Sequence, residues 1–94
     1  MLKPAARLGD MSTGHDGYPP RPAVQASDNV FINNKGAVRL GDKWAVHCRR
    51  SCHDGVSYTG SNVVFINNKA AVRIGDKISC GDTVAQGSTN VYIG

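Results

Sequence analysis

Apolar and polar positions alternate in short runs along the chain, and one such pattern occurs twice. Residues 27–42 read SDNVFINNKGAVRLGD and residues 61–76 read SNVVFINNKAAVRIGD, and the two align without a gap. Each copy places β-branched and aromatic residues before an Asn-Asn pair and a second apolar run after it, which predicts a β-hairpin. No run near either copy keeps a helical period of apolar residues. The pattern therefore predicts two hairpins of one kind, and such internal repetition fixes an architecture.

The two ends of the chain carry the halves of a third copy. Residues 3–10 read KPAARLGD, like the second half of the repeat, and residues 88–94 read STNVYIG, like the first half. Tyr92 then falls where Phe31 and Phe65 fall. If the last strand pairs with the first, the two ends form a third hairpin, and three hairpins close into a ring. We therefore expect an all-β domain of three pseudo-threefold hairpins, the third built from the N- and C-terminal strands.

The size and composition of the chain indicate that this domain needs additional stabilisation. A chain of 94 residues is one domain, residues 1–94, with no room for a fused effector domain. It has one Trp, two Phe and three Tyr against eleven Gly, and small domains with few large side chains usually depend on a metal, disulfides or a partner. Trp44 is expected to be buried as local core.

Charge and hydropathy favour no membrane or nucleic-acid role. The net charge is +4, and the Lys and Arg residues are spread through the repeats and do not form a run. The N-terminal residues lack the apolar segment of a secretory signal, and no stretch approaches transmembrane length. Export of the protein would therefore use a route other than the general pathway.

The Arg-x-Gly-Asp tetrads are better explained by structure than by adhesion or phosphate binding. Glycine permits a turn at the strand end, and the aspartate can cap that turn through backbone amides. The arginine is expected to pair with a carboxylate or to pack its stem over the sheet. The tetrads begin at Arg7, Arg39 and Arg73.

Three candidate metal ligands lie at equivalent places in the three loops. His15, His47 and Cys80 each follow the arginine of their tetrad by seven or eight residues. Threefold symmetry would bring these side chains to one end of the ring, near its axis. His53 lies in the longest loop, residues 43–60, and is the one additional candidate.

Four nitrogen and sulfur donors suit one tetrahedral Zn²⁺ in a closed, structural site. Cys48 and Cys52 are rival ligands, and His53 is favoured because these two cysteines have no counterpart in the other repeats. The odd number of cysteines argues against a disulfide framework, although a Cys48–Cys52 bridge can form in an oxidising compartment. Otherwise the two cysteines are plain loop positions.

Three hairpins around an axis leave open strand edges and a blunt apolar end opposite the metal. Monomeric proteins normally suppress such edges and patches. Their presence in triplicate predicts a partner that is itself threefold and ends in β-structure.

The residues PAAR at positions 4–7 open a series of motifs that extends through the chain. The motif HDGYPP follows from His15, the two hairpins carry Phe-Ile-Asn and Val-Arg-x-Gly-Asp, Cys80 lies in Ser-Cys-Gly, and the chain closes on GSTNVYIG. Together these motifs resemble the PAAR-repeat family over essentially the whole chain. The extra cysteines at positions 48 and 52 depart from the family pattern.

The resemblance implies a small cone of hairpins with a zinc near its point, held by His15, His47, His53 and Cys80. It further implies that the base caps the trimeric β-helical spike of a contractile machine, either the VgrG protein of type VI secretion or the central spike of a phage tail. One cap would serve each trimer, sharpen the spike for piercing, contact the target membrane transiently and carry separate effector proteins. The protein would assemble in the cytoplasm, or in a phage virion, and then be injected.

Two other functions compete with this interpretation. A zinc hydrolase needs an open coordination position and a general base, whereas Cys80 closes the shell. A small zinc-containing nucleic-acid-binding module is suggested by the net charge and by Arg49 and Arg50, but the sequence offers no recognition helix and no basic face with stacking aromatics. We therefore expect no enzymatic activity and no nucleic-acid partner.

Overall fold

The structure is a computed structural model, and it describes residues 2–94. All regular elements in this range are β-strands, so the expected all-β class is confirmed. No helix in the described range is long and apolar enough to cross a bilayer. The eight strands are β1 (Lys3–Pro4), β2 (Phe31–Ile32), β3 (Lys35–Gly36), β4 (Lys43–Cys48), β5 (Cys52–Val56), β6 (Phe65–Ile66), β7 (Lys69–Ala70) and β8 (Tyr92–Ile93).

The two repeats form the hairpins β2–β3 and β6–β7, as predicted. Asn33 and Asn34 adopt φ angles of 54° and 64°, and the corresponding Asn67 and Asn68 adopt 53° and 65°. Two consecutive residues with positive φ make a type I′ turn, which matches the twist of the paired strands, and asparagine tolerates this conformation better than most residues. The Asn-Asn pairs therefore set both turns.

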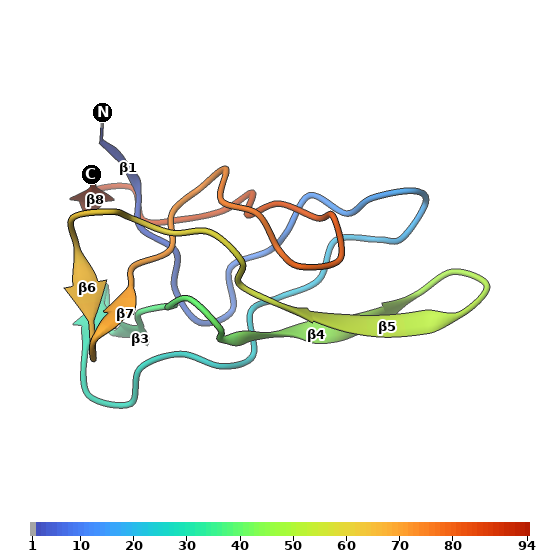
Figure 1. The fold of residues 1–94 in the computed structure, drawn as a ribbon, viewed down its shortest axis with the longest axis horizontal. Coiled ribbons are helices and arrows are strands. Elements are labelled where there is room, and N and C mark those ends of the chain that lie inside the picture. The colour runs from blue at the N-terminus through green and yellow to red at the C-terminus, as the bar shows by residue number, and fades with distance from the viewer. Residues whose placement is uncertain (1) are drawn as a thin grey trace.

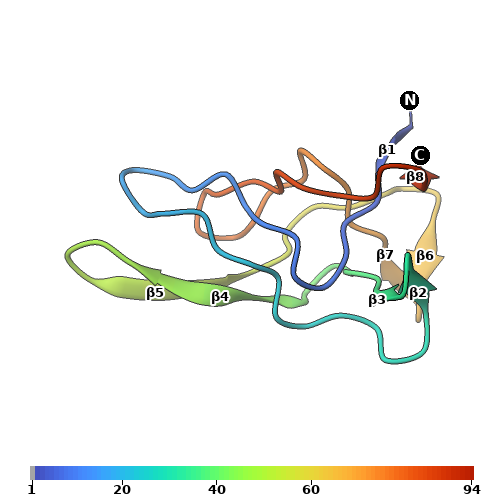
Figure 2. The ribbon, with the colours of Figure 1, turned by 180° about the vertical axis from the view of Figure 1, so that it is seen from behind.

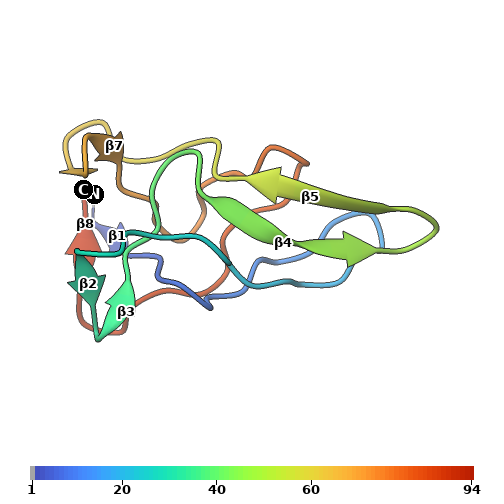
Figure 3. The same cartoon turned by 90° about the horizontal axis from the view of Figure 1, so that it is seen from below.

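The third hairpin is formed by the two ends of the chain. Strand β1 pairs antiparallel with β8, with Lys3 opposite Ile93 and Pro4 opposite Tyr92. The same register pairs Phe31 with Gly36 in β2–β3 and Phe65 with Ala70 in β6–β7. The predicted third hairpin is thus confirmed, and the termini lie side by side (Figures 1 and 3).

A closed cycle of backbone hydrogen bonds joins the three repeats around the axis. The amide of Ala6 donates to the carbonyl of Val72 (2.9 Å), Val72 donates to Val38 (3.1 Å), and Val38 donates to Ala6 (3.1 Å). These residues occupy the same position in each repeat and are fully buried. The cycle therefore fixes the ring at its centre.

Two small apolar clusters form the core, and the residues of this cycle belong to one of them. The cluster toward the hairpins combines three buried alanines and three isoleucines, one of each from every repeat: Ala5, Ala37, Ala71, Ile32, Ile66 and Ile93. The other cluster contains Trp44, which is 1% exposed as predicted, together with Ala6, Ala23, Val38, Val72, Ile78 and Val84. Trp44 Nε1 donates to Ser57 Oγ at 2.9 Å, which satisfies the one polar atom of the ring.

Each Arg-x-Gly-Asp tetrad is a structural turn, as the sequence indicated. In the first, Arg7 donates from its backbone amide and from Nε to Asp10 Oδ2 (2.8 and 3.0 Å) and from Nη2 to Oδ1 (3.0 Å). The intervening Gly9 has a φ of 88°, which favours glycine. The pairs Arg39–Asp42 and Arg73–Asp76 repeat this arrangement.

The segment 43–60, which we expected to be a loop, contains a fourth hairpin, β4–β5. Its strands pair Trp44 with Gly55 and His47 with His53, and the register shifts between Trp44 and His47. These strands were not predicted because most of this stretch is polar and shows no regular apolar alternation. Trp44 anchors the base of the hairpin in the core, and the far end is closed by a disulfide between Cys48 and Cys52.

The resulting molecule is elongated, with extents of 37 × 26 × 21 Å. Strands β1, β8, β2, β3, β6 and β7 gather at one end, and β4–β5 extends to the other (Figures 1 and 2). We call the first the base and the second the tip. The arrangement separates a threefold β-surface from the region that carries the histidines.

We expect Asp76→Asn to lower the free energy of unfolding by about 2–3 kcal/mol at neutral pH, because Arg73 loses its charged acceptor. Burial raises the pKa of Asp76, but hydrogen bonds from the Arg73 side chain and backbone and from Thr59 outweigh it and lower the pKa below 3.8. This stabilisation is therefore complete above about pH 3.8 and is lost as the pH falls through the lower, folded-state pKa.

Urea denaturation of both chains between pH 7 and pH 2 measures this effect. The difference between Asp76→Asn and the unaltered chain should shrink on acidification. The exposed Asp28 offers a control, since Asp28→Asn should change stability little at any pH. A difference for Asp76→Asn that stays constant down to pH 2 would contradict the assignment.

Candidate metal centre

The four predicted ligand residues come from three separate parts of the chain. His15 lies in the loop before the prolines, where it forms an isolated bridge with Tyr18. His47 and His53 face each other across β4–β5. Cys80 lies in a turn closed by a hydrogen bond from the amide of Gly81 to the carbonyl of Ile78 (3.0 Å).

The structure brings these four side chains together. One ligand atom from each residue, three imidazole nitrogens and the Cys80 sulfur, lies within 4.8 Å of all the others. The Nε2 atoms of His15, His47 and His53 are separated by 3.1, 3.1 and 2.7 Å. Zn–N bonds of about 2.0–2.1 Å in a tetrahedron separate nitrogen ligands by about 3.3 Å. The three rings therefore converge at nearly the separation that a metal ion requires.

Hydrogen bonds at the outer side of two rings orient their lone pairs inward. His47 Nδ1 lies 2.7 Å from the carbonyl oxygen of Pro19, to which it can only donate, so Nε2 of the neutral ring carries a lone pair. His15 Nδ1 lies 3.3 Å from Asp16 Oδ2 and donates to that carboxylate. Metal-bound histidines typically donate their second N–H to a carbonyl or carboxylate in this way.

The surroundings favour the neutral form of His53, which is the form that binds metals. Burial lowers the pKa of His53, and the neighbouring His47, His15 and Arg21 lower it further, while Asp54 opposes them in part. Three imidazole nitrogens and one sulfur thus form a group that can hold a metal ion.

Two side chains that the sequence did not single out complete the centre. The Tyr18 ring stacks on His15, with ring centroids 5.1 Å apart, and contacts His53 at 4.3 Å. Arg21 is buried and donates from Nη2 to Cys80 Sγ at 3.0 Å. Neither residue belongs to a local motif with metal-ligand spacing, so only the folded chain identifies them.

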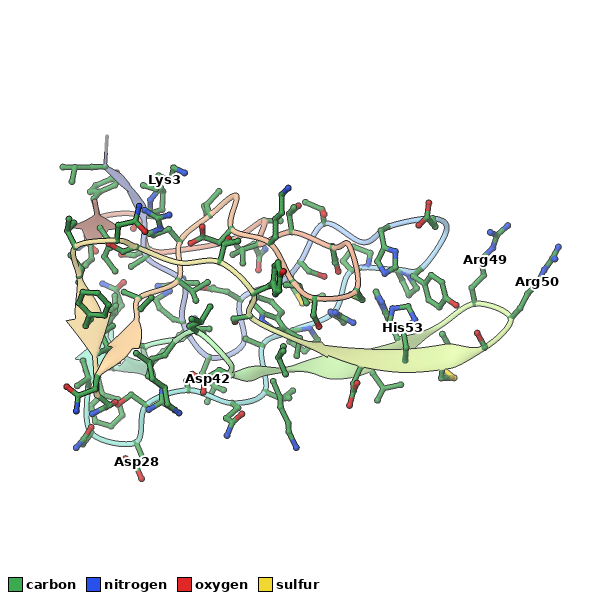
Figure 4. The ribbon with its side chains drawn as sticks, viewed as in Figure 1. Lys3, Asp28, Asp42, Arg49, Arg50 and His53 are labelled. Carbon is green, nitrogen blue, oxygen red and sulfur yellow. A yellow bond between two sulfur atoms is a disulfide. The ribbon has the colours of Figure 1, made fainter. Side chains whose placement is uncertain are left out.

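The far end of β4–β5 is tied to the loop that carries His15. Arg49 Nη1 donates to the carbonyl of Asp16 at 3.1 Å, and a side chain at Gly17 would overlap the Arg49 stem at 2.8 Å. Figure 4 shows His53 directed from β5 toward the neighbouring loop, with Arg49 and Arg50 farther along at the tip. Arg49 thus has a structural contact within the chain.

The two remaining cysteines are not rival ligands. Cys48 and Cys52 form a disulfide across β4–β5, which corrects the view of them as ligands or plain loop positions. The two residues face each other at the last pair of the hairpin, so their sulfurs bond to each other and cannot bind a metal. Cys80 keeps a free thiol.

Comparison with known proteins agrees with the motifs in the sequence. The family model described as PAAR motif matches residues 13–86, which include all four residues of the metal-binding group. A search of curated proteins finds no match.

If this group holds the metal, the cysteines should differ sharply in their importance. We expect Cys80→Ser to lose most of its metal after dialysis against a chelator, because a thiolate ligand is removed. The double variant Cys48→Ser/Cys52→Ser should retain as much metal per chain as the unaltered protein. Elemental analysis of purified chains gives the ratio, and metal loss in the double variant would contradict the assignment.

Proposed function

Because the chain belongs to the PAAR motif family, we propose that it is the tip protein of a contractile injection spike. Proteins with this motif are structural components associated with the caps of trimeric, VgrG-like spikes. We further propose that this chain caps one such trimer, sharpens it for passage through a target envelope, contacts the target membrane in transit and carries separate effectors. It would assemble in the cytoplasm, or in a phage virion, and leave with the spike.

The base supports docking on a threefold partner. Three aromatic side chains at equivalent positions are exposed there: Phe31 and Phe65 at 60% each and Tyr92 at 51%. They come from the hairpins β2–β3, β6–β7 and β1–β8, which lie together at one end of the molecule (Figure 3). Large apolar side chains repeated in one exposed patch typically mark an interaction site. This repetition is the single observation on which the proposed spike partner depends.

The short base strands offer main-chain groups as well as side chains. Each of the three base sheets has only two strands, and within residues 2–94 no neighbouring segment bonds to the main chain of Phe31, Phe65 or Tyr92, so β2, β6 and β8 keep open edges. The other edges are partly covered, because the carbonyls of Gly36, Ala70 and Pro4 accept hydrogen bonds from neighbouring repeats. The blunt end of a β-helical trimer presents three strand ends with the same symmetry. Apolar contact and strand addition can therefore act at all three corners together.

For the opposite end we propose one structural Zn²⁺ bound by His15, His47, His53 and Cys80. Three imidazoles and a thiolate match its ligand preference, and four protein ligands leave no open position for a catalytic water. His15, His47 and His53 belong to neither apolar cluster, and Cys80 only packs against the edge of one. The ion would therefore hold together the part of the molecule that has the least core.

Removing the metal should destabilise the protein severely. A structural zinc contributes on the order of 10 kcal/mol of apparent binding free energy, comparable to the whole stability of a small domain. We expect chelation to lower the unfolding midpoint by tens of degrees and zinc to restore it, measured by circular dichroism. An apoprotein with the same midpoint would argue against a structural ion.

Binding to a spike tests the proposed partner directly. We expect the chain to bind a purified trimeric VgrG-like protein with one copy per three spike chains, as measured by native mass spectrometry. Substituting Ser for Phe31, Phe65 and Tyr92 together should weaken binding at least 100-fold, because three exposed aromatic anchors are lost.

The tip hairpin supplies a matched control for that substitution. Val46 is 58% exposed and lies on β4, away from the base, so Val46→Ser should bind the spike normally. A complex with one copy per spike chain would exclude the capping geometry. Equal binding by the triple variant would exclude the aromatic base as the docking surface.

A further inference from the structure

Arg21 is an unusual residue because its charged side chain is buried beside the metal-binding group. The residue is only 2% exposed, whereas arginine is rarely buried unless it is paired. Its guanidinium donates from Nη1 to the carbonyl of Ala45 at 3.0 Å and from Nη2 to Cys80 Sγ at 3.0 Å. The Cys80 sulfur is therefore one of the few partners of a buried cation.

The nearest carboxylate only partly compensates this charge. Arg21 Nε lies 3.5 Å from Asp82 Oδ2, and within residues 2–94 neither atom has a hydrogen-bond partner. The other oxygen of Asp82 accepts from Thr13 Oγ1 at 2.9 Å and from the amide of Thr83 at 2.8 Å. Asp82 is thus held in place by its own bonds, and Nη2 of Arg21 is left to the sulfur.

Gly55 on strand β5 leaves space for the contact between Arg21 and the Cys80 sulfur. A Cβ atom at Gly55 would lie 2.8 Å from Arg21 Nη2 and 3.3 Å from Cys80 Sγ. The φ of Gly55 is not in the left-handed region, so its backbone does not itself require glycine. The absence of a side chain at this buried position is what allows the guanidinium to approach the sulfur.

We propose that Arg21 is a positioning residue of the metal centre, which donates a charge-assisted hydrogen bond to the metal-bound sulfur of Cys80. This inference rests on the metal site proposed above. A cysteine sulfur that binds a metal ion is a thiolate, and hydrogen bonds to charged groups are stronger than those between neutral groups. The bond orients the sulfur and withdraws part of its negative charge from the metal, while Asp82 balances the arginine.

Cobalt(II) in place of zinc reports on this bond through the thiolate-to-cobalt charge-transfer absorption. A donor to the sulfur lowers the energy of its lone pairs, so Arg21→Met should move the band to longer wavelength. Arg21→Lys keeps a positive charge near the sulfur, so its absorption band should lie closer in wavelength to the band of the unaltered chain. We also expect Arg21→Met to bind cobalt about 10- to 100-fold more weakly, as for the loss of other groups that orient metal ligands.

Arg39→Met is the matched control for a general loss of stability. Arg39 is a partly buried arginine whose side chain hydrogen-bonds to Asp42 and Asn67 and, within residues 2–94, to no member of the metal-binding group. Its removal should leave the band unmoved even if it lowers stability. A band that moves equally in both variants, or in neither, would overturn the role of Arg21.

A measurement on the unaltered chain makes the test independent of how the variants fold. In the protein loaded with ¹¹³Cd, a guanidinium proton of Arg21 should show scalar coupling to the metal through the N–H···S bond in the NMR spectrum. Coupling to Cys80 Hβ without coupling to Arg21 overturns this inference and leaves the metal site intact. A chain that binds neither cobalt nor cadmium overturns the metal site and, with it, this role of Arg21.

Discussion

The rest of the structure depends on three backbone hydrogen bonds that run in a circle between Ala6, Val72 and Val38. A cycle this small closes only if the three repeats have the same geometry about one axis. It also requires small side chains beside it, which the buried Ala5, Ala37 and Ala71 provide. Since the circle fixes where each repeat begins, it places three aromatic rings at one end and the starts of three loops at the other.

The metal centre shows where this symmetry ends. The threefold arrangement places one candidate ligand in each of three loops. A tetrahedral ion, however, needs four ligands. For the proposed ion, His53 would supply the fourth from β5, opposite His47 across a hairpin that the other repeats lack in the described residues. The departure from threefold symmetry is therefore concentrated in residues 43–56, and the disulfide and the Arg49 contact hold this addition in place.

Much of the fold was predictable because the repeat is visible in the sequence and its halves recur at both ends. Trp44 was expected in the core since few other large side chains compete for it. The hairpin β4–β5 was missed because HCRRSCHDG shows no apolar alternation, and its pairing follows from the Trp44 anchor. Of the four converging residues, His15, His47 and Cys80 were predicted from their positions in the repeats, and His53 as the additional histidine of the longest loop. Arg21 and Tyr18 were not, because their roles depend on neighbours such as Gly55 that are distant in sequence.

The pairing of β1 with β8 has a consequence for anything joined to this chain. Both termini emerge from the same corner of the base, beside the proposed docking surface (Figure 3). If the proposed spike is the partner, a polypeptide fused to either end would start beside the junction with the spike, and the tip would stay bare. Cargo could thus be tethered at either terminus without lengthening or blunting the leading point.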